Sequence, residues 1–212
     1  MACWLIGLGL VSLAGIAGAV ALQALLSPGS TPEIRGTYLE DGRPMADFEL
    51  ITSSGEPFTT GDLEGQWTLL AFGAPSAQAE ARETIALLER VHALLAQTHH
   101  GDRLQSAWIS VEPPEEPRQR LAPLKASGHE TLHLLTGEPS VVGPLAHSLG
   151  VRYSQGASGV VVQPADVLFV IAPDGKLLAL LLPPQHPELI AQDLFTLMEH
   201  RASPLSRIIP GL

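Results

Sequence analysis

The sequence predicts an α/β fold. Continuous apolar runs of strand length alternate along the chain with segments whose apolar residues recur at helical spacing. Near the C-terminus two apolar runs flank "APDG", whose Asp-Gly pair is typical of a hairpin turn. Residues 37–200 are enough for one globular domain with a substantial core.

In the first part of this domain the sequence predicts a hairpin, a buried strand and a helix. Residues 47–51 alternate and then meet the turn-rich "TSSGEP", which favours a short strand and a hairpin. The run "WTLLAF", residues 67–72, is apolar throughout, as in a strand covered on both faces. Over residues 77–97 the spacing becomes helical, as in the pair Ile85 and Leu88.

The remaining elements complete the topology. They are a strand over 104–111, a short helix over 118–126, a brief strand over 132–135, a helix over 141–149, strands over 166–171 and 176–182, and a helix over 186–200. A βαβ crossover followed by an antiparallel ββα unit is the thioredoxin arrangement. We therefore expect a thioredoxin-like fold with an N-terminal hairpin extension and an insertion before the third core strand.

The N-terminus predicts one transmembrane helix. Residues 3–26 carry no charge and are long enough to cross a bilayer. A cleaved signal peptide is the alternative, because residues 19–21 resemble an A-x-A site, but no Lys or Arg precedes the apolar run. We expect an uncleaved anchor. The domain boundaries that follow are an anchor over 1–26, a linker over 27–36, the thioredoxin-like domain over 37–200 and a tail over 201–212.

Charge and cysteine content exclude several functions. The net charge of −10 argues against nucleic-acid binding. The one cysteine, Cys3, lies in the expected anchor, so the domain itself has no thiol. A thiol peroxidase or disulfide reductase needs a thiolate nucleophile and is therefore excluded.

Four stretches carry a family resemblance. They are "DFELITSSGEPFTTGDLEGQWTLLAFGAP", "WISVEPPEEP", "HLLTG" and "LFVIAPDGKL". Together they resemble the Sco/SenC family, whose members are membrane-anchored thioredoxin-fold proteins that deliver copper to cytochrome c oxidase. The resemblance implies a membrane location with the domain in the bacterial periplasm, and a protein partner that is an oxidase subunit or an assembly factor.

The family's copper ligands have no counterpart at the matching positions. In the family, a Cys-x-x-x-Cys pair follows the Phe-Gly motif, and a distant histidine completes a soft ligand set. Counting from Phe-Gly places Ala77 and Ala81 at the cysteines, and Pro164 at the histidine. We therefore predict no catalytic, cofactor-binding or metal-binding residue, and no cofactor. The fold also predicts a cis bond between Gln163 and Pro164.

Other polar residues are expected to have ordinary roles. Vicinal His99 and His100 lack a further ligand in the sequence. Solvated or capping roles are expected for these two and for His129, His133, His147, His186 and His200. Ser76 has no catalytic histidine near it. Glu112, Glu115 and Glu116 are expected to form a solvated acidic surface, and Trp67 and Trp108 to pack in the core.

Two functional hypotheses remain. The first is a non-enzymatic Sco/SenC-like accessory factor in oxidase biogenesis that binds a protein partner and no small-molecule substrate. Residues 150–163 and 203–212 are its candidate contact segments, although both also fit an ordinary loop and chain end. The alternative is a copper chaperone that uses non-standard ligands such as His99 and His100, or ligands from a second chain.

Overall fold

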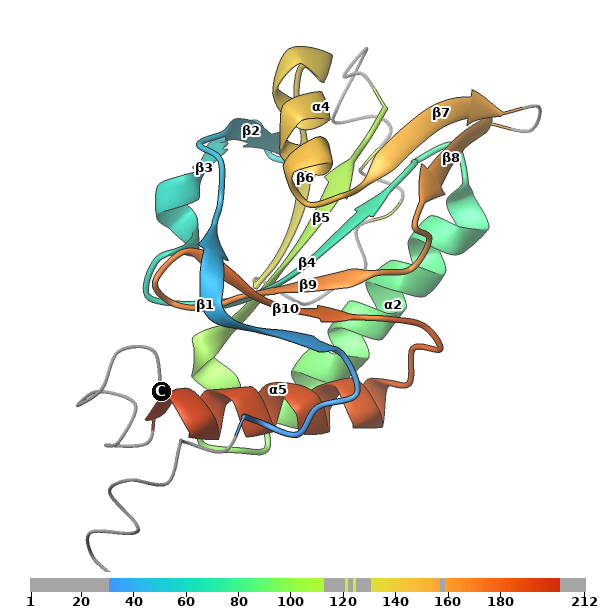
Figure 1. Ribbon diagram of the computed structural model, residues 1–212. Helices are drawn as coiled ribbons and strands as arrows, with labels where there is room; N and C mark the ends of the chain where they lie inside the picture. The colour runs from blue at the N-terminus through green and yellow to red at the C-terminus, as the bar shows by residue number, and fades with distance from the viewer. Residues whose placement is uncertain (1–30, 113–120, 122–123, 125–130, 157–158, 203–212) are drawn as a thin grey trace, which may run out of the picture. The chain divides into compact units, whose positions relative to one another are not determined.

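The secondary structure follows the predicted order. The computed structural model describes residues 31–112, 121, 124, 131–156 and 159–202. These form β1 (Thr37–Pro44), β2 (Glu49–Thr52), β3 (Pro57–Thr59), the 3-10 helix η1 (Thr60–Leu63), β4 (Trp67–Gly73), α2 (Gln78–Leu95), the 3-10 helix η2 (Gly101–Arg103), β5 (Leu104–Ser110), β6 (Leu132–Thr136), α4 (Pro139–Ser148), β7 (Arg152–Gly156), β8 (Gly159–Gln163), β9 (Leu168–Ile171), β10 (Lys176–Leu181) and α5 (Pro187–Ala202) (Figure 1). Residues 32–202 form one compact unit.

A mixed sheet in the order β1-β10-β9-β4-β5-β6-β2-β3 organises this unit. β4 is parallel to β5 and β5 to β6, whereas β9 is antiparallel to both β4 and β10. β4, α2 and β5 make the βαβ unit, and β9, β10 and α5 make the ββα unit. The predicted thioredoxin-like fold is thus confirmed, and its N-terminal hairpin, β2–β3, joins the sheet through β6.

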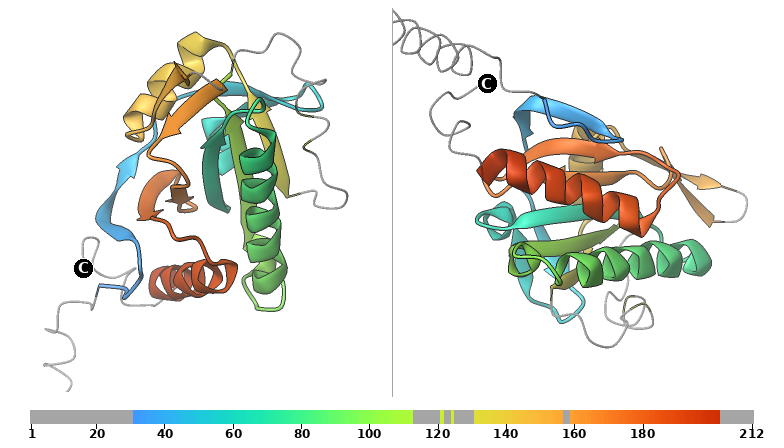
Figure 2. Two further views of the ribbon diagram at one scale, coloured as in Figure 1. Left: turned by 90° about the vertical axis from the view of Figure 1, so that its right-hand side faces the viewer. Right: turned by 90° about the horizontal axis from the view of Figure 1, so that it is seen from below.

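Alternation along the central strands divides the core between the two faces of the sheet. Leu69 packs on the side of α2 and α5, whereas Leu70 packs on the side of α4. Figure 2 shows these helices on the two faces. Both leucines are at most 1% exposed. Burial of a leucine side chain contributes about 1.5–3 kcal/mol, which explains why the central run is apolar throughout.

Two features of the sheet were not predicted. β1 pairs with β10, but its register shifts between Tyr38 and Arg43, and three charged residues hide its alternation. β7 and β8 form a separate hairpin within residues 150–163, where the sequence predicted only an insertion. In this hairpin Val160 and Val162 pack against the core, and Val161 is 43% exposed.

Two expectations fall mainly outside the described residues. Of the helix expected over 118–126, only Leu121 and Leu124 are among the described residues, and both are buried in the core on the α2 side. Residues 1–26, the expected anchor, all lie outside the described residues.

The predicted single-pass membrane location is contradicted and is corrected here. In the described part of the chain, no helix has the length and apolar character needed to span a bilayer. The long helix α2, for example, carries Glu80, Arg82, Glu83, Glu89 and Arg90.

The close approach of β4 and β5 leaves no room for a side chain at Gly73. A Cβ at this position would lie 2.4 Å from Cζ2 of the buried Trp108. We expect Gly73→Ala to lower the free energy of unfolding by about 1–3 kcal/mol, because the indole must shift within a packed core. Urea titration of both proteins measures this change.

Gly143→Ala is the matched control. It lies in α4, where a Cβ would meet only the Tyr153 hydroxyl at 3.5 Å. This variant should be neutral or more stable by about 0.5–1 kcal/mol, since alanine favours a helix. Equal stability of Gly73→Ala and the wild type would contradict the assigned packing.

Candidate functional site

The turn between β4 and α2 has apolar side chains at the predicted ligand positions. Ala77 N donates to Ala74 O at 3.0 Å, and Ala81 N donates to Ala77 O at 2.9 Å. Ala77 and Ala81 are therefore one helical turn apart, as a pair of metal-binding side chains would be. Their methyl groups have no lone pair for a metal, and Ala81 is 3% exposed in the core.

Pro164 lies between β8 and β9 and is exposed. The predicted cis bond between Gln163 and Pro164 is confirmed. A pyrrolidine ring, like a methyl group, offers no ligand atom, so these three side chains do not fit the soft thiolate and imidazole set that copper(I) prefers. Their equivalence to the family's ligands stays a prediction, because it rests on motif spacing.

Ser76, in the same turn, is held by Glu112 from the segment just after β5. The Ser76 amide donates to Glu112 Oε2 at 3.2 Å, and the Ser76 hydroxyl donates to Oε1. The Glu112 amide in turn donates to Ser110 Oγ at 3.2 Å. Glu112 is 6% exposed, so the expected solvated surface is wrong for this residue. Its carboxylate fixes the turn; Glu115 and Glu116 lie outside the described residues.

The other predicted residues are dispersed. Trp67 and Trp108 are buried in the core, as expected. His147 is exposed in the last turn of α4, and His186 is exposed just before α5. The ring of His200 meets Tyr38 edge-on, with centroids 6.0 Å apart, and His129 lies outside the described residues.

His133, in β6, is partly buried beside Phe58, with ring centroids 5.0 Å apart. Burial lowers the pKa of His133 below its usual 6.5, although the charge of Asp62 acts in the opposite direction. This histidine therefore resists protonation in the folded protein.

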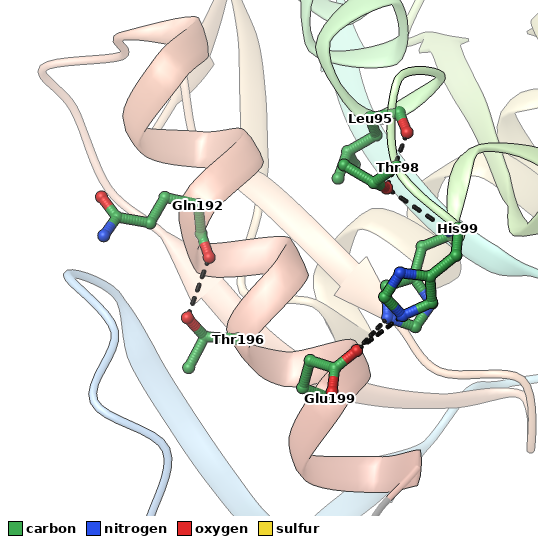
Figure 3. Close-up of polar contacts among 7 residues, drawn as sticks. Leu95, Thr98, His99, Gln192, Thr196 and Glu199 are labelled. Carbon is green, nitrogen blue, oxygen red and sulfur yellow. Dashed lines mark hydrogen bonds and ion pairs between the residues drawn. The ribbon is translucent and has the colours of Figure 1, made fainter.

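His99 and His100 meet Glu199, a residue that no sequence pattern indicated. Nε2 of each histidine lies 2.8 Å from Glu199 Oε1 (Figure 3). The three side chains offer ligand atoms within 4.8 Å of one another. Hydrogen bonds from His100 and then His99 lower the pKa of the Glu199 carboxyl. A carboxylate oxygen from α5 thus lies beside the histidine pair.

Local structure positions this group, which we call the His–His–Glu cluster. Thr98 Oγ1 donates to Leu95 O at 2.8 Å and accepts from the His100 amide at 3.2 Å, which fixes the turn after α2. Phe195, one turn before Glu199 on α5, contacts the rings of His99 and His100 edge-on, with centroids 5.8 and 5.5 Å away. Glu199 could have been identified as a neighbour of the two histidines by first inferring that α2 packs against α5.

Comparisons with known proteins agree on one family. The SCO1/SenC family model matches residues 37–199. The mitochondrial SCO1 homolog of Mus musculus is 26% identical over 143 residues, which cover 65% of this chain and 50% of that protein. The chain spans between 50% and 63% of the length of the first three curated relatives, all mitochondrial SCO1 or SCO2 homologs.

Solved structures share the fold. Yeast Sco1 with copper bound has a TM-score of 0.64 and 18% identity, covering 76% of this chain and 94% of that one. BsSco, whose report describes a disulfide switch in a member of the Sco family of cytochrome c oxidase assembly proteins, has a TM-score of 0.61 and 16% identity. The latter match covers 73% of this chain and 93% of BsSco.

The Ser76–Glu112 contact predicts a loss of stability in Ser76→Ala. Removing a hydroxyl donor from a buried carboxylate should lower the free energy of unfolding by about 1.5–3 kcal/mol. Ser148→Ala, which removes a hydrogen bond to the neutral Leu145 carbonyl, is the control and should lose only about 0.5–1.5 kcal/mol. Urea unfolding measures the free energy of unfolding of both variants. A larger decrease in Ser148→Ala than in Ser76→Ala would contradict the role of Glu112.

His133 predicts that stability falls on acidification. Its folded pKa is below 6.5, so the unfolded chain takes up a proton first as the pH falls below that value. The contribution of this residue is therefore intact above 6.5 and is lost as the pH falls from there towards the folded pKa. In urea unfolding at a series of pH values, His133→Gln should reduce this loss of stability. An equal loss in His133→Gln and in the wild type would contradict the role of His133.

Proposed function

The chain belongs to the SCO1/SenC family, and from this premise we propose that it is an accessory factor in cytochrome c oxidase biogenesis. In this proposal the protein binds an oxidase subunit or another assembly factor and catalyses no reaction. The observation that carries it is a complete β4–α2 framework in which Ala77 and Ala81 have no donor atom. The description of BsSco as a member of a family of oxidase assembly proteins supports the oxidase context.

The chemistry of the domain supports recognition in place of copper or thiol transfer. Two-thiolate binding of copper(I) and disulfide exchange both require sulfur, and Cys3 is the one cysteine of the chain. The Ser76–Glu112 contact holds the turn between β4 and α2 in place. A fixed surface suits binding, because little conformational entropy is lost when a partner docks.

The β7–β8 hairpin is the proposed contact element. It belongs to a sheet of its own, and Val161 presents an apolar side chain that is 43% exposed while its neighbours pack inward. Burial of such a side chain by a partner contributes favourably to binding. The second candidate segment, residues 203–212, lies outside the described residues.

Affinity capture from the native source tests this function. The tagged full chain, expressed at its natural level and crosslinked in cells, should recover oxidase subunits or known oxidase assembly factors. Val161→Asp should reduce that recovery by about tenfold, because a charge would be desolvated at the contact. Ile51→Asp is the matched control, since Ile51 is also a strand residue, 41% exposed, on β2. Failure to recover any oxidase component would overturn the proposal.

Copper(I) loading of the same protein separates the two hypotheses. The wild type should lose copper(I) on desalting in the presence of a competing chelator, whereas Ala77→Cys/Ala81→Cys should retain it through two thiolates. Tight retention by the wild type would favour the alternative, a copper chaperone with non-standard histidine ligands. Copper(I) is the discriminating ion because it prefers sulfur over imidazole and carboxylate ligands.

A further inference from the structure

We propose that the His–His–Glu cluster is a binding site for one divalent transition-metal ion of the Cu²⁺ or Zn²⁺ type. The inference is independent of the proposed partner function, and it places the ion at the opposite end of α2 from Ala77 and Ala81. Its basis is the convergence of His99, His100 and Glu199 from two segments separated by about a hundred residues of chain.

The donor set selects the class of ion. Two imidazole nitrogens and one carboxylate oxygen are ligands that Zn²⁺ and Cu²⁺ accept, whereas copper(I) prefers sulfur and Ca²⁺ or Mg²⁺ prefer oxygen alone. Three protein ligands with a remaining position for water is also the arrangement of open zinc sites. The same chemistry would therefore admit either ion, with Cu²⁺ bound more tightly according to the general order of affinities.

The two distances between the histidines and the carboxylate require only a small adjustment. Metal–ligand bonds of about 2.0–2.1 Å at tetrahedral angles set neighbouring donor atoms about 3.3 Å apart. Each Nε2 lies 2.8 Å from Glu199 Oε1, so each of these two distances must increase by about half an ångström. The side chains of His99 and Glu199 are 68% and 48% exposed, which leaves them room to make this change.

The site is positioned before any ion binds. His100 is 4% exposed, and its ring is held by packing against Phe195 and by the contact between its Nε2 and Glu199, while its Nδ1 has no hydrogen-bond partner among the described residues. Gly101 allows the tight turn, because a Cβ there would lie 2.6 Å from the Cα of Ala96. Ligands that are already ordered lose little entropy on binding. A bound ion would join the end of α2 to the end of α5.

Binding would also fix the tautomer of both histidines. Nε2 of each ring faces Glu199 Oε1, and a nitrogen that binds a metal ion carries no proton. The ion would replace these hydrogen bonds with coordinate bonds to the same atoms, and the proton of each imidazole would then lie on Nδ1.

Metal titration of the full chain tests the site. With Zn²⁺ at neutral pH, calorimetry should give one ion per chain, and His99→Asn and Glu199→Gln should each weaken binding by about tenfold or more. Both residues are exposed, so these variants should fold, and their circular dichroism checks this. His186→Asn, at another exposed histidine, is the matched control and should bind as the wild type does.

Spectroscopy of Cu²⁺ identifies the ligands directly. Electron paramagnetic resonance should show coupling to two imidazole nitrogens in the wild type and to one in His99→Asn. The inference is overturned if the wild type binds no stoichiometric ion, or if His99→Asn and Glu199→Gln retain its affinity. It is also overturned if His186→Asn weakens binding equally. Loss of stability in His99→Asn with unchanged metal affinity would show that the cluster is only a hydrogen-bonded clamp.

Discussion

The parallel pairing of β4 with β5 determines where the two ends of α2 lie. Its register runs from Trp67 opposite Leu104 to Gly73 opposite Ser110, and one more bond joins the Val111 amide to the Gly73 carbonyl. Because the two strands end at the same edge, the turn after β4 meets the segment after β5, and Ser76 reaches Glu112. α2 must then return to the start of β5, which places the histidine turn at the other end of that helix.

Periodicity was sufficient for the central elements and insufficient at the edges. β4, α2, β5, β9, β10 and α5 each have a strong local pattern, and all were predicted. β1 was missed because it owes its position to pairing with β10 and carries charges that conceal alternation. The burial of Glu112 and the position of Glu199 could not be read from the sequence for a similar reason. Each depends on a contact with a residue far away along the chain.

The two ends of α2 differ in the donor atoms that their side chains offer. At its first turn, where the family resemblance implies soft sulfur ligands, the chain has methyl groups and a serine tied to a carboxylate. Beyond its last turn, two imidazoles face a carboxylate on α5. The same strand pairing and helix packing therefore present apolar side chains at one end of α2 and nitrogen and oxygen donor atoms at the other. The fold sets where these side chains lie, and their residue types set the chemistry that they offer.

The interrupted edges of the sheet limit how a second protein can approach. At one edge, β1 carries Glu40, Asp41 and Arg43 and changes register part of the way along. At the other edge, β3 is only three residues long and begins with Pro57. Neither offers the long, regular row of backbone groups on which an incoming strand would extend the sheet. Strand addition to the eight-stranded sheet, and with it edge-to-edge aggregation through β1 or β3, is therefore disfavoured. A partner that meets this sheet would recognise side chains on its faces and adjoining loops.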